Sequence, residues 1–105
     1  MQLTSFLENG RLTVILTGEI DHHSAKKFME AISAKIEAYT TRTCHLDFTD
    51  VSFMDSSGIA VVLNALRSVQ KMGGTICLIN LSNQPLKVFR AAGIDRIVQI
   101  KEGVR

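Results

Sequence analysis

The stretch VSFMDSSG, residues 51–58, joins a short apolar segment to an amphipathic run that continues to Met72. Apolar residues recur every three or four positions in that run, which predicts a helix that begins at Asp55-Ser56-Ser57-Gly58. Backbone N–H groups are unpaired at the start of a helix and can receive an anion. The turn therefore suits three roles, which are a helix cap, a nucleophile and a phosphorylation switch.

Toward the N-terminus, the sequence predicts a hairpin, a helix and a strand. Strands are expected over Leu3–Leu7 and Arg11–Leu16, joined through Asn9-Gly10, because both turn residues tolerate positive φ. Thr17-Gly18-Glu19 is expected to end the second strand. A helix is predicted over residues 24–39 and a strand over residues 44–48, where apolar and polar residues alternate. The inward face of that helix is expected to comprise Ala25, Phe28, Ile32, Ile36 and Tyr39.

Toward the C-terminus, the helix after the DSSG turn is expected to stop at Gly73-Gly74. A buried strand over Thr75–Ile79 follows. A further helix opens at Asn83-Gln84-Pro85 and ends at Gly93, and a last strand covers Ile97–Ile100. The inward face of the helix after the DSSG turn is expected to comprise Ile59, Val62, Leu63, Leu66 and Val69.

This order of elements predicts an α/β fold in a single domain over residues 1–105. An antiparallel hairpin opens a mixed sheet, and the later strands are parallel and joined by right-handed helical crossovers.

The composition argues against several classes of function. The net charge is +2, the twelve Lys and Arg are scattered, and there is no Trp, so direct binding of nucleic acid is not expected. No apolar run approaches the roughly 20 residues that span a bilayer, and the first residues do not resemble a signal peptide. We therefore expect a cytoplasmic protein without a membrane partner. Cys44 and Cys77 are expected to be buried, reduced thiols in strands.

An enzymatic site would need Ser56 or Ser57 as nucleophile. A histidine (His22, His23 or His45) would act as base, oriented by Asp21 or Asp55. Met54 occupies the position of the first glycine of a Gly-x-Ser-x-Gly elbow, and His45 lies within a predicted strand, so a catalytic triad is disfavoured.

Asp21-His22-His23 carries metal-ligand residue types, but adjacent histidines rarely bind one ion and no third ligand follows at helical spacing. The residues alone favour a polar loop in which Asp21 or Ser24 caps the next helix. No cofactor and no metal are expected.

The two remaining roles of the DSSG turn are compatible. One of Asp55, Ser56 or Ser57 is expected to cap the helix, which stabilises it by about 1 kcal/mol. At least one hydroxyl then stays available, and phosphorylation would add a charge of about −1.5 to −2 there. The helix dipole tolerates such a charge, whereas an acidic partner surface does not.

Two segments, Leu16–Ala25 and Phe53–Gly58, resemble the STAS family, most closely its anti-sigma factor antagonists. The Gly-Glu-Ile-Asp-His-His element, residues 18–23, is similar to the sporulation type that opposes the anti-sigma F factor. The resemblance extends over nearly the whole chain, through Lys71–Gly74 and Phe89–Ile94. Members of the family usually end with a further helix, which is expected to be missing here because only Lys101–Arg105 remain.

This resemblance implies a switchable binding protein. The unphosphorylated antagonist would bind an anti-sigma factor that is also a serine kinase, and thereby free a sigma factor for transcription. The kinase would use ATP to phosphorylate Ser56, and a PP2C-type phosphatase would reverse the modification. The partner surface implied by the family maps onto Asp21, His22, His23, Asp55, Ser57 and Gly58.

Two alternatives remain at this point. A STAS scaffold subunit of a stress-sensing or transporter-associated complex would form a stable multi-subunit assembly. A small serine hydrolase would be labelled covalently at Ser56 or Ser57.

Overall fold

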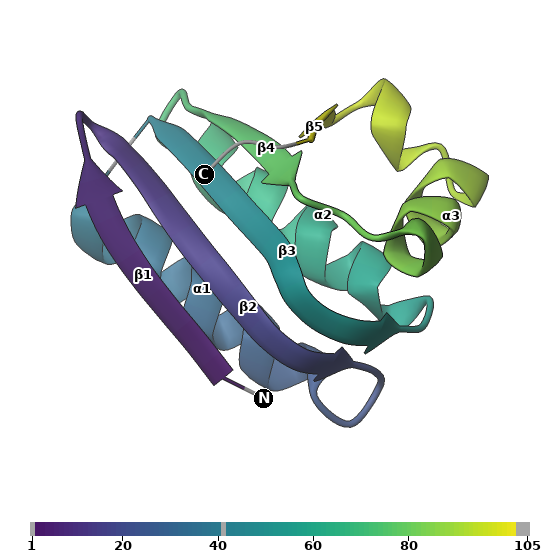
Figure 1. The fold of residues 1–105 in the computed structure, drawn as a ribbon. Coiled ribbons are helices and arrows are strands. Elements are labelled where there is room, and N and C mark those ends of the chain that lie inside the picture. Colours follow the sequence, from purple (N-terminus) through teal and green to yellow (C-terminus); the bar gives the residue numbers. More distant parts are fainter. Residues whose placement is uncertain (1, 41, 103–105) are drawn as a thin grey trace.

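Five strands form one mixed sheet in the computed structural model of the chain, which describes residues 2–40 and 42–102 (Figure 1). The strands follow the order β1-β2-β3-β4-β5; β1 and β2 are antiparallel, and each later neighbouring pair is parallel. The predicted mixed α/β architecture is therefore confirmed. The elements are β1 (Gln2–Glu8), β2 (Arg11–Ile20), α1 (Ala25–Tyr39), β3 (Thr43–Met54), α2 (Ser57–Gln70), β4 (Thr75–Ile79), α3 (Asn83–Ala91), a 3₁₀ turn (Ile94–Arg96) and β5 (Gln99–Lys101).

The opening hairpin has the predicted two-residue loop. Glu8 pairs with Arg11, and the two loop residues adopt positive φ angles, 52° at Asn9 and 78° at Gly10. A glycine and an asparagine reach this left-handed region at little cost, so local sequence alone determines the turn.

The second strand was predicted to end at Thr17-Gly18-Glu19, and this is wrong. β2 continues to Ile20, with irregular pairing to β3 between Ile15 and Thr17 and between Gly18 and Glu19. Gly18 has a φ of 106°, which a glycine adopts without steric cost. The residues that resemble a strand end therefore continue β2, paired with β3, which carries one extra residue at each irregularity.

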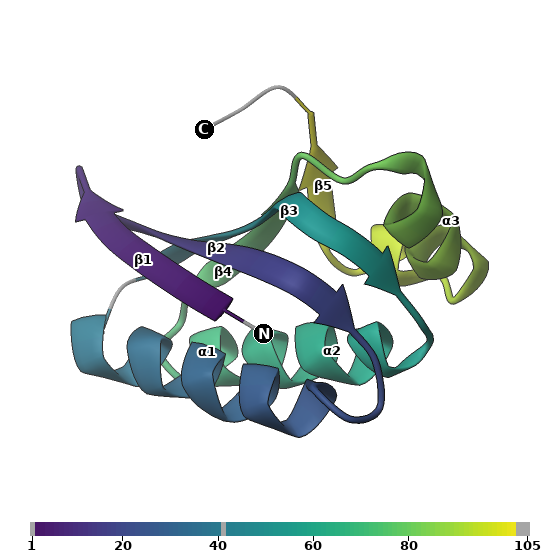
Figure 2. The same ribbon diagram turned by 60° about the horizontal axis from the view of Figure 1, so that its bottom comes forward.

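Two helices cover one face of the sheet, as Figure 2 shows for α1 and α2. The inward side of α1 is as predicted for Ala25, Phe28, Ile32 and Ile36, whereas Tyr39 is 39% exposed. Fully burying an apolar side chain of this kind contributes about 1.5–3 kcal/mol. The core thus lies between these helices and the apolar side chains of β2, β3 and β4.

The buried side of α2 is rotated relative to the prediction. Val62 and Val69 are buried as expected, but Ile59, Leu63 and Leu66 are only partly buried. The other buried side chains of α2 are those of Val61, Ala65 and Ser68. Ser68 is accommodated because its hydroxyl lies 3.0 Å from that of Ser33 on α1. Asn64 donates a further bond of 2.9 Å to Ser33. Polar pairing between the helices thus allows a serine to be buried on α2.

The third and last strands also differ from the prediction. β3 extends to Met54 and not only to Phe48, while the last strand is Gln99–Lys101 and not Ile97–Ile100. The 3₁₀ turn over residues 94–96 leaves Ile97 57% exposed. β4 pairs only with residues 43–47, and α3 contacts β3 through an edge-to-face pair of Phe48 and Phe89, whose ring centroids are 5.6 Å apart.

The thiol prediction is confirmed, because Cys44 and Cys77 are both free and buried. Burial raises the pKa of the Cys44 thiol to about 12. In the part of the chain that the structure describes, no helix has the length and apolar character needed to cross a membrane. The expectation that the family's last helix is missing concerned residues 101–105. Of these, residues 103–105 lie outside the described residues.

Gly74 offers a test of the connection between α2 and β4. A Cβ atom at Gly74 would lie 2.5 Å from the backbone oxygen of Arg42 and 2.9 Å from its Cα, so backbone would have to move. We expect Gly74→Ala to lower the free energy of unfolding by about 1–3 kcal/mol, as overpacking does. Chemical denaturation measures this.

Gly73→Asn is the matched control, because Gly73 has a φ of 70° in open space and asparagine tolerates that conformation. If both variants lost the same stability, the close approach at Arg42 would not be the cause.

Candidate functional site

Two polar turns lie side by side at the carboxyl ends of β2 and β3. Ile20, the last residue of β2, pairs with Met54, the last residue of β3. The Asp55 backbone N–H then donates to the Ile20 carbonyl at 3.0 Å. This bond ties the turn before α2 to the turn before α1. The structure therefore brings together the two segments that the sequence singled out separately.

The turn before α2 is capped by Asp55. Its carboxylate oxygen Oδ1 accepts the Ser57 N–H at 2.8 Å, and its backbone carbonyl accepts the Gly58 N–H at 3.1 Å. Ser56 occupies the N-cap position of α2, with a φ of −62°, but its side chain makes no cap bond. The predicted cap is thus confirmed and assigned to the aspartate.

Ser56 is left with an accessible hydroxyl. Its side chain is exposed, and it makes no hydrogen bond to any residue that the structure describes. Ser57, directly after it, is only partly exposed. Of the two adjacent hydroxyls, that of Ser56 is the more open to an incoming enzyme.

The turn before α1 repeats the same design. Oδ1 of Asp21 accepts the N–H groups of His23 and Ser24, both at 3.0 Å. The Ser24 hydroxyl closes the loop by donating to the Glu19 carbonyl at 2.9 Å. The pKa of Asp21 is lowered from its ordinary value of 3.8, chiefly because the Ser24 backbone N–H stabilises the carboxylate. The Asp21 carboxylate thus organises the turn before α1, but neither it nor the Ser24 side chain makes a cap bond to the helix, so the predicted side-chain cap is not formed.

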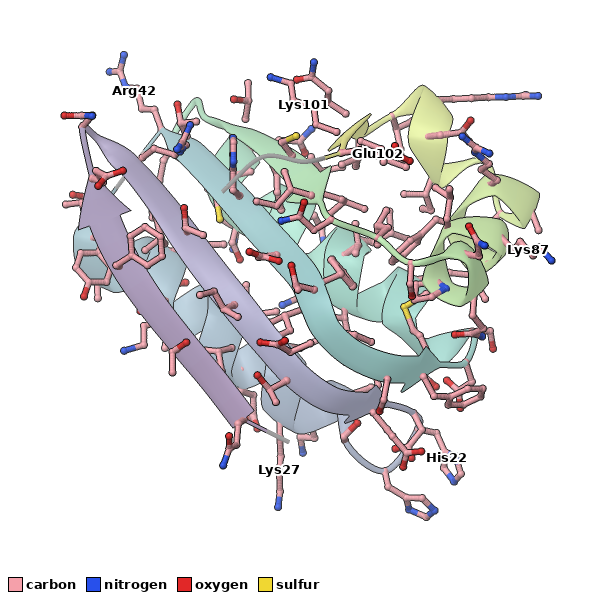
Figure 3. The ribbon with its side chains drawn as sticks, viewed as in Figure 1. His22, Lys27, Arg42, Lys87, Lys101 and Glu102 are labelled. Atoms are coloured by element: carbon pink, nitrogen blue, oxygen red, sulfur yellow. The ribbon has the colours of Figure 1, made fainter. Side chains whose placement is uncertain are left out.

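The two histidines of this turn are exposed and lie together. Their ring centroids are 3.9 Å apart with the planes tilted by 38°. Figure 3 shows His22 at the outer end of the sheet, pointing away from the core. Beside them lies an open hollow of about 300 Å³. It is lined by Glu19, Asp21, His23, Ser24 and Lys27.

Gly58 differs from the other predicted contact residues because it is buried. A Cβ atom there would collide with the side chain of Met54, which is fully buried. The glycine thus lets α2 start directly against the last residue of β3. Its place in the structure is a support beneath the turn.

Gln84 is a positioning residue that the sequence reasoning missed. Its side-chain amide donates to the Met54 carbonyl at 2.6 Å, and its Oε1 accepts the Met54 N–H at 2.9 Å. β4 does not reach this part of β3, so the amide of Gln84 satisfies both backbone groups as a neighbouring strand would. A glutamine at a helix start carries no local signal for a contact 30 residues away.

The structure does not assemble a catalytic triad around Ser56 with His45. His45 lies nine residues before Met54 on β3, and a strand rises about 3.3 Å per residue. This histidine is therefore near the opposite end of the sheet. No group of three or more His, Cys, Asp or Glu within the described residues could hold a metal ion.

Comparison with known proteins identifies the architecture around this site. The model of the STAS domain family matches residues 7–105. The chain is 38% identical over 86 residues to an anti-sigma F factor antagonist of Lysinibacillus sphaericus, covering 80% of this chain and 74% of that protein. It is 34% identical over 90 residues to an anti-sigma-B factor antagonist of Bacillus subtilis, covering 85% and 80%.

Solved structures agree with this match. The unphosphorylated form of the anti-sigma factor antagonist SpoIIAA superposes with a TM-score of 0.83 at 28% identity, over 99% of this chain and 90% of that one. The phosphorylated form of Bacillus SpoIIAA gives a TM-score of 0.73 at 30% identity, over 99% and 91%.

Removing the amide of Gln84 should loosen the end of β3. We expect Gln84→Ala to lower the free energy of unfolding by about 1 kcal/mol and to speed hydrogen exchange of the Met54 amide, because two hydrogen bonds are lost. Gln70→Ala, at an exposed glutamine of α2, is the control. Gln84→Glu should be impaired at neutral pH, since a carboxylate cannot donate to the Met54 carbonyl. Unchanged exchange at Met54 in both Gln84 variants would contradict the positioning role.

Asp21 should stabilise the fold only while its carboxyl group is ionised. Its pKa is lowered on folding, so its contribution is fully present above about pH 4 and is lost as the pH falls through the lowered folded value. NMR titration of the Asp21 side-chain carbonyl should give a midpoint below 3.8. Ser24→Ala retains the backbone donor and should keep most of that shift; a midpoint at or above the ordinary value in the unaltered chain would refute the turn geometry.

Proposed function

The chain belongs to the STAS domain family, and we propose that it acts as an anti-sigma factor antagonist within a single STAS domain. In its unphosphorylated state it binds an anti-sigma factor, and this binding releases a sigma factor for transcription. The observation that carries the proposal is the exposed, unbonded hydroxyl of Ser56 at the start of α2. The names of the relatives supply the class of partner.

The proposed partner surface combines both turns. We call it the switch face and define it as Asp21, His22, His23, Asp55, Ser56 and Ser57. The bond from Asp55 to Ile20 holds the two turns in a fixed relation, so one partner can contact both at once. The exposed imidazoles and the carboxylates of Asp21 and Asp55 give this face both ring nitrogens and anionic oxygens. Gly58 contributes by holding α2 close to Met54.

Phosphorylation of Ser56 would change the charge of the switch face without unfolding it. The Ser56 hydroxyl makes no hydrogen bond in the described structure, so nothing is broken when a phosphate replaces its proton. The new charge of about −1.5 to −2 lies at a helix N-terminus, where it is favourable. The fold is therefore expected to keep its stability.

Phosphorylation of Ser56 would weaken partner binding, although it leaves the fold stable. Asp55 lies next to Ser56, so the phosphate would strengthen an existing negative charge on the switch face. A like charge about 4 Å away costs about 1 kcal/mol even in water-like surroundings, and the phosphate carries nearly two. An acidic partner surface would be repelled by this change. We propose that the anti-sigma factor is itself the serine kinase, which uses ATP, and that a PP2C-type phosphatase restores binding.

The relatives carry the names of both anti-sigma F and anti-sigma-B antagonists. We favour the sporulation type, because the element over residues 18–23 resembles it and because SpoIIAA is a solved neighbour. A purely scaffolding role has less support, since structural neighbours outside the antagonist group, such as a sulfate transporter family protein at 16% identity, share the fold alone.

The switch is tested with a serine kinase of the anti-sigma type and ATP. Peptide mass spectrometry should find phosphate on Ser56 in the unaltered chain and in Ser57→Ala, and none in Ser56→Ala. In binding measurements, Ser56→Ala should retain the kinase and Ser56→Glu should weaken binding by about tenfold, the equivalent of about 1.4 kcal/mol.

Two results would overturn the proposal. Equal affinities of Ser56→Ala and Ser56→Glu would remove the electrostatic basis of the switch. Phosphate on Ser57 alone would move the switch to the less exposed hydroxyl. Thermal unfolding of both variants serves as the control, because neither change is expected to alter the fold.

A further inference from the structure

A second polar cluster lies at the other end of the sheet from the switch face. It comprises Arg11, His45, Cys77 and Lys101, one residue from each of β2, β3, β4 and β5, and we call it the basic corner. Thr13 pairs with His45, His45 with Cys77 and Cys77 with Gln99. Arg11 lies two residues before Thr13 and Lys101 two residues after Gln99. Since side chains alternate along a strand, all four share one face of the sheet.

This face is not the one that α1 and α2 cover. The intervening residues, such as Leu12, Cys44 and Leu78, belong to the core beneath those helices, so the basic corner lies on the opposite face (Figure 2). Figure 3 shows Lys101 at the far end of the molecule from His22. The basic corner is therefore spatially separate from the proposed partner surface.

Two polar atoms of the basic corner are buried without a partner. His45 is only 6% exposed, and its Nδ1 makes no hydrogen bond. Nε of Arg11 is likewise buried and unbonded. Leaving a buried polar group unsatisfied costs about 1–3 kcal/mol, and native proteins rarely tolerate it without a reason. Two such atoms on neighbouring strands indicate a missing acceptor.

Two cations act on His45. Burial is the main cause of the lowered pKa of His45, and the cations Arg11 and Lys101 lower it further. Burial also raises the pKa of Cys77, so its thiol stays neutral and adds no negative charge.

Neither Nε of Arg11 nor Nδ1 of His45 is bonded to an acidic group on this face within the described residues. Glu8 is opposite Arg11 in the hairpin, but no ion pair joins them within the described residues. Asp47, two residues along β3, accepts hydrogen bonds from Thr49 at 2.6 and 2.9 Å and from Asn80 at 3.4 Å.

We propose that the basic corner binds a small oxyanion of the sulfate or phosphate class. The Arg11 guanidinium and the Lys101 ammonium supply charge, and Nε–H of Arg11 donates to one oxygen. His45 donates from Nδ1 to another, as the Nδ1–H tautomer or as the imidazolium. A tetrahedral oxyanion has enough acceptor oxygens to receive both buried donors and still face solvent, while Lys101, two strands away from His45, contributes positive charge.

Binding of such an anion must be linked to protonation of His45. The anion stabilises the imidazolium, so it raises the pKa of His45, and by linkage its affinity increases as the pH falls through that pKa. The other charged or titratable groups on this side of the sheet are Arg11, Lys101, Cys77, Glu8 and Asp47, and burial raises the pKa of the Cys77 thiol.

The test is an NMR titration of the full chain with sodium sulfate against sodium chloride at constant ionic strength. Sulfate should cause saturable shifts at Arg11, His45 and Lys101 and should raise the His45 pKa relative to chloride. The signals of His22 and His23, at the other end of the sheet, should not respond to the exchange of chloride for sulfate. Inorganic phosphate at pH 6 is the second probe, and Ser56→Ala should bind both anions unchanged, which separates this site from the switch.

Arg11→Gln should weaken sulfate binding by about tenfold or more, because one charged hydrogen-bonding partner is lost. Arg11→Lys retains charge without the planar fork and should bind with intermediate strength. Lys87→Gln removes an exposed cation on α3, well apart from Lys101 in Figure 3, and should bind as the unaltered chain does. The same His45 pKa in sulfate and chloride, or equal losses in the Arg11 and Lys87 variants, would overturn the proposal.

Discussion

The parallel pairing of β2 with β3 sets the position of every residue in the switch face. The two strands end together at Ile20 and Met54, and the Asp55 N–H extends the pairing by one further bond to Ile20. Carboxyl ends of parallel strands meet at one edge, so the turns that lead into α1 and α2 become neighbours. Each turn begins with an aspartate whose carboxylate accepts the N–H two residues on, at His23 and at Ser57. At the two irregularities of this pairing β3 carries one residue more than β2, and beyond them the strands end together.

Capping by an aspartate that precedes the serines has a direct chemical consequence. A serine at the start of a helix usually bonds to the backbone with its own hydroxyl and gains about 1 kcal/mol in doing so. Asp55 takes over that task, so the hydroxyl of Ser56 is not needed for stability. A modification that would otherwise break a cap leaves this helix start intact. The structural and the regulatory demands on one short turn are divided between adjacent residues.

Local sequence predicted what local interactions determine. The Asn9-Gly10 turn, the span of α1, the strand over residues 75–79 and the start of α3 follow from turn chemistry and periodicity. The errors lie where distant contacts override the local pattern. Thr17-Gly18-Glu19 resembles a strand end, yet pairing with β3 carries β2 through it. Ser68 is buried through a hydrogen bond to Ser33, and Gln84 reaches Met54 across 30 residues. None of these contacts could be predicted from the local sequence, because each joins residues far apart in the chain.

The candidate site was predictable only where it depends on local interactions. The role of Asp55 as a cap is local and was anticipated, whereas Asp21 bonds within its own turn and does not cap α1. The support beneath the turn before α2 is not local. Gln84 bonds to both backbone groups of Met54, and Gly58 allows α2 to begin against the Met54 side chain. The residue before Asp55 is thus fixed from two sides while Ser56 is held by none of its own side-chain bonds. The backbone below Ser56 is held in place, and the Ser56 hydroxyl is not bonded. A phosphate added there would change the charge of the surface and leave the arrangement of the turn unchanged. Its effect on partner binding is therefore expected to be mainly electrostatic.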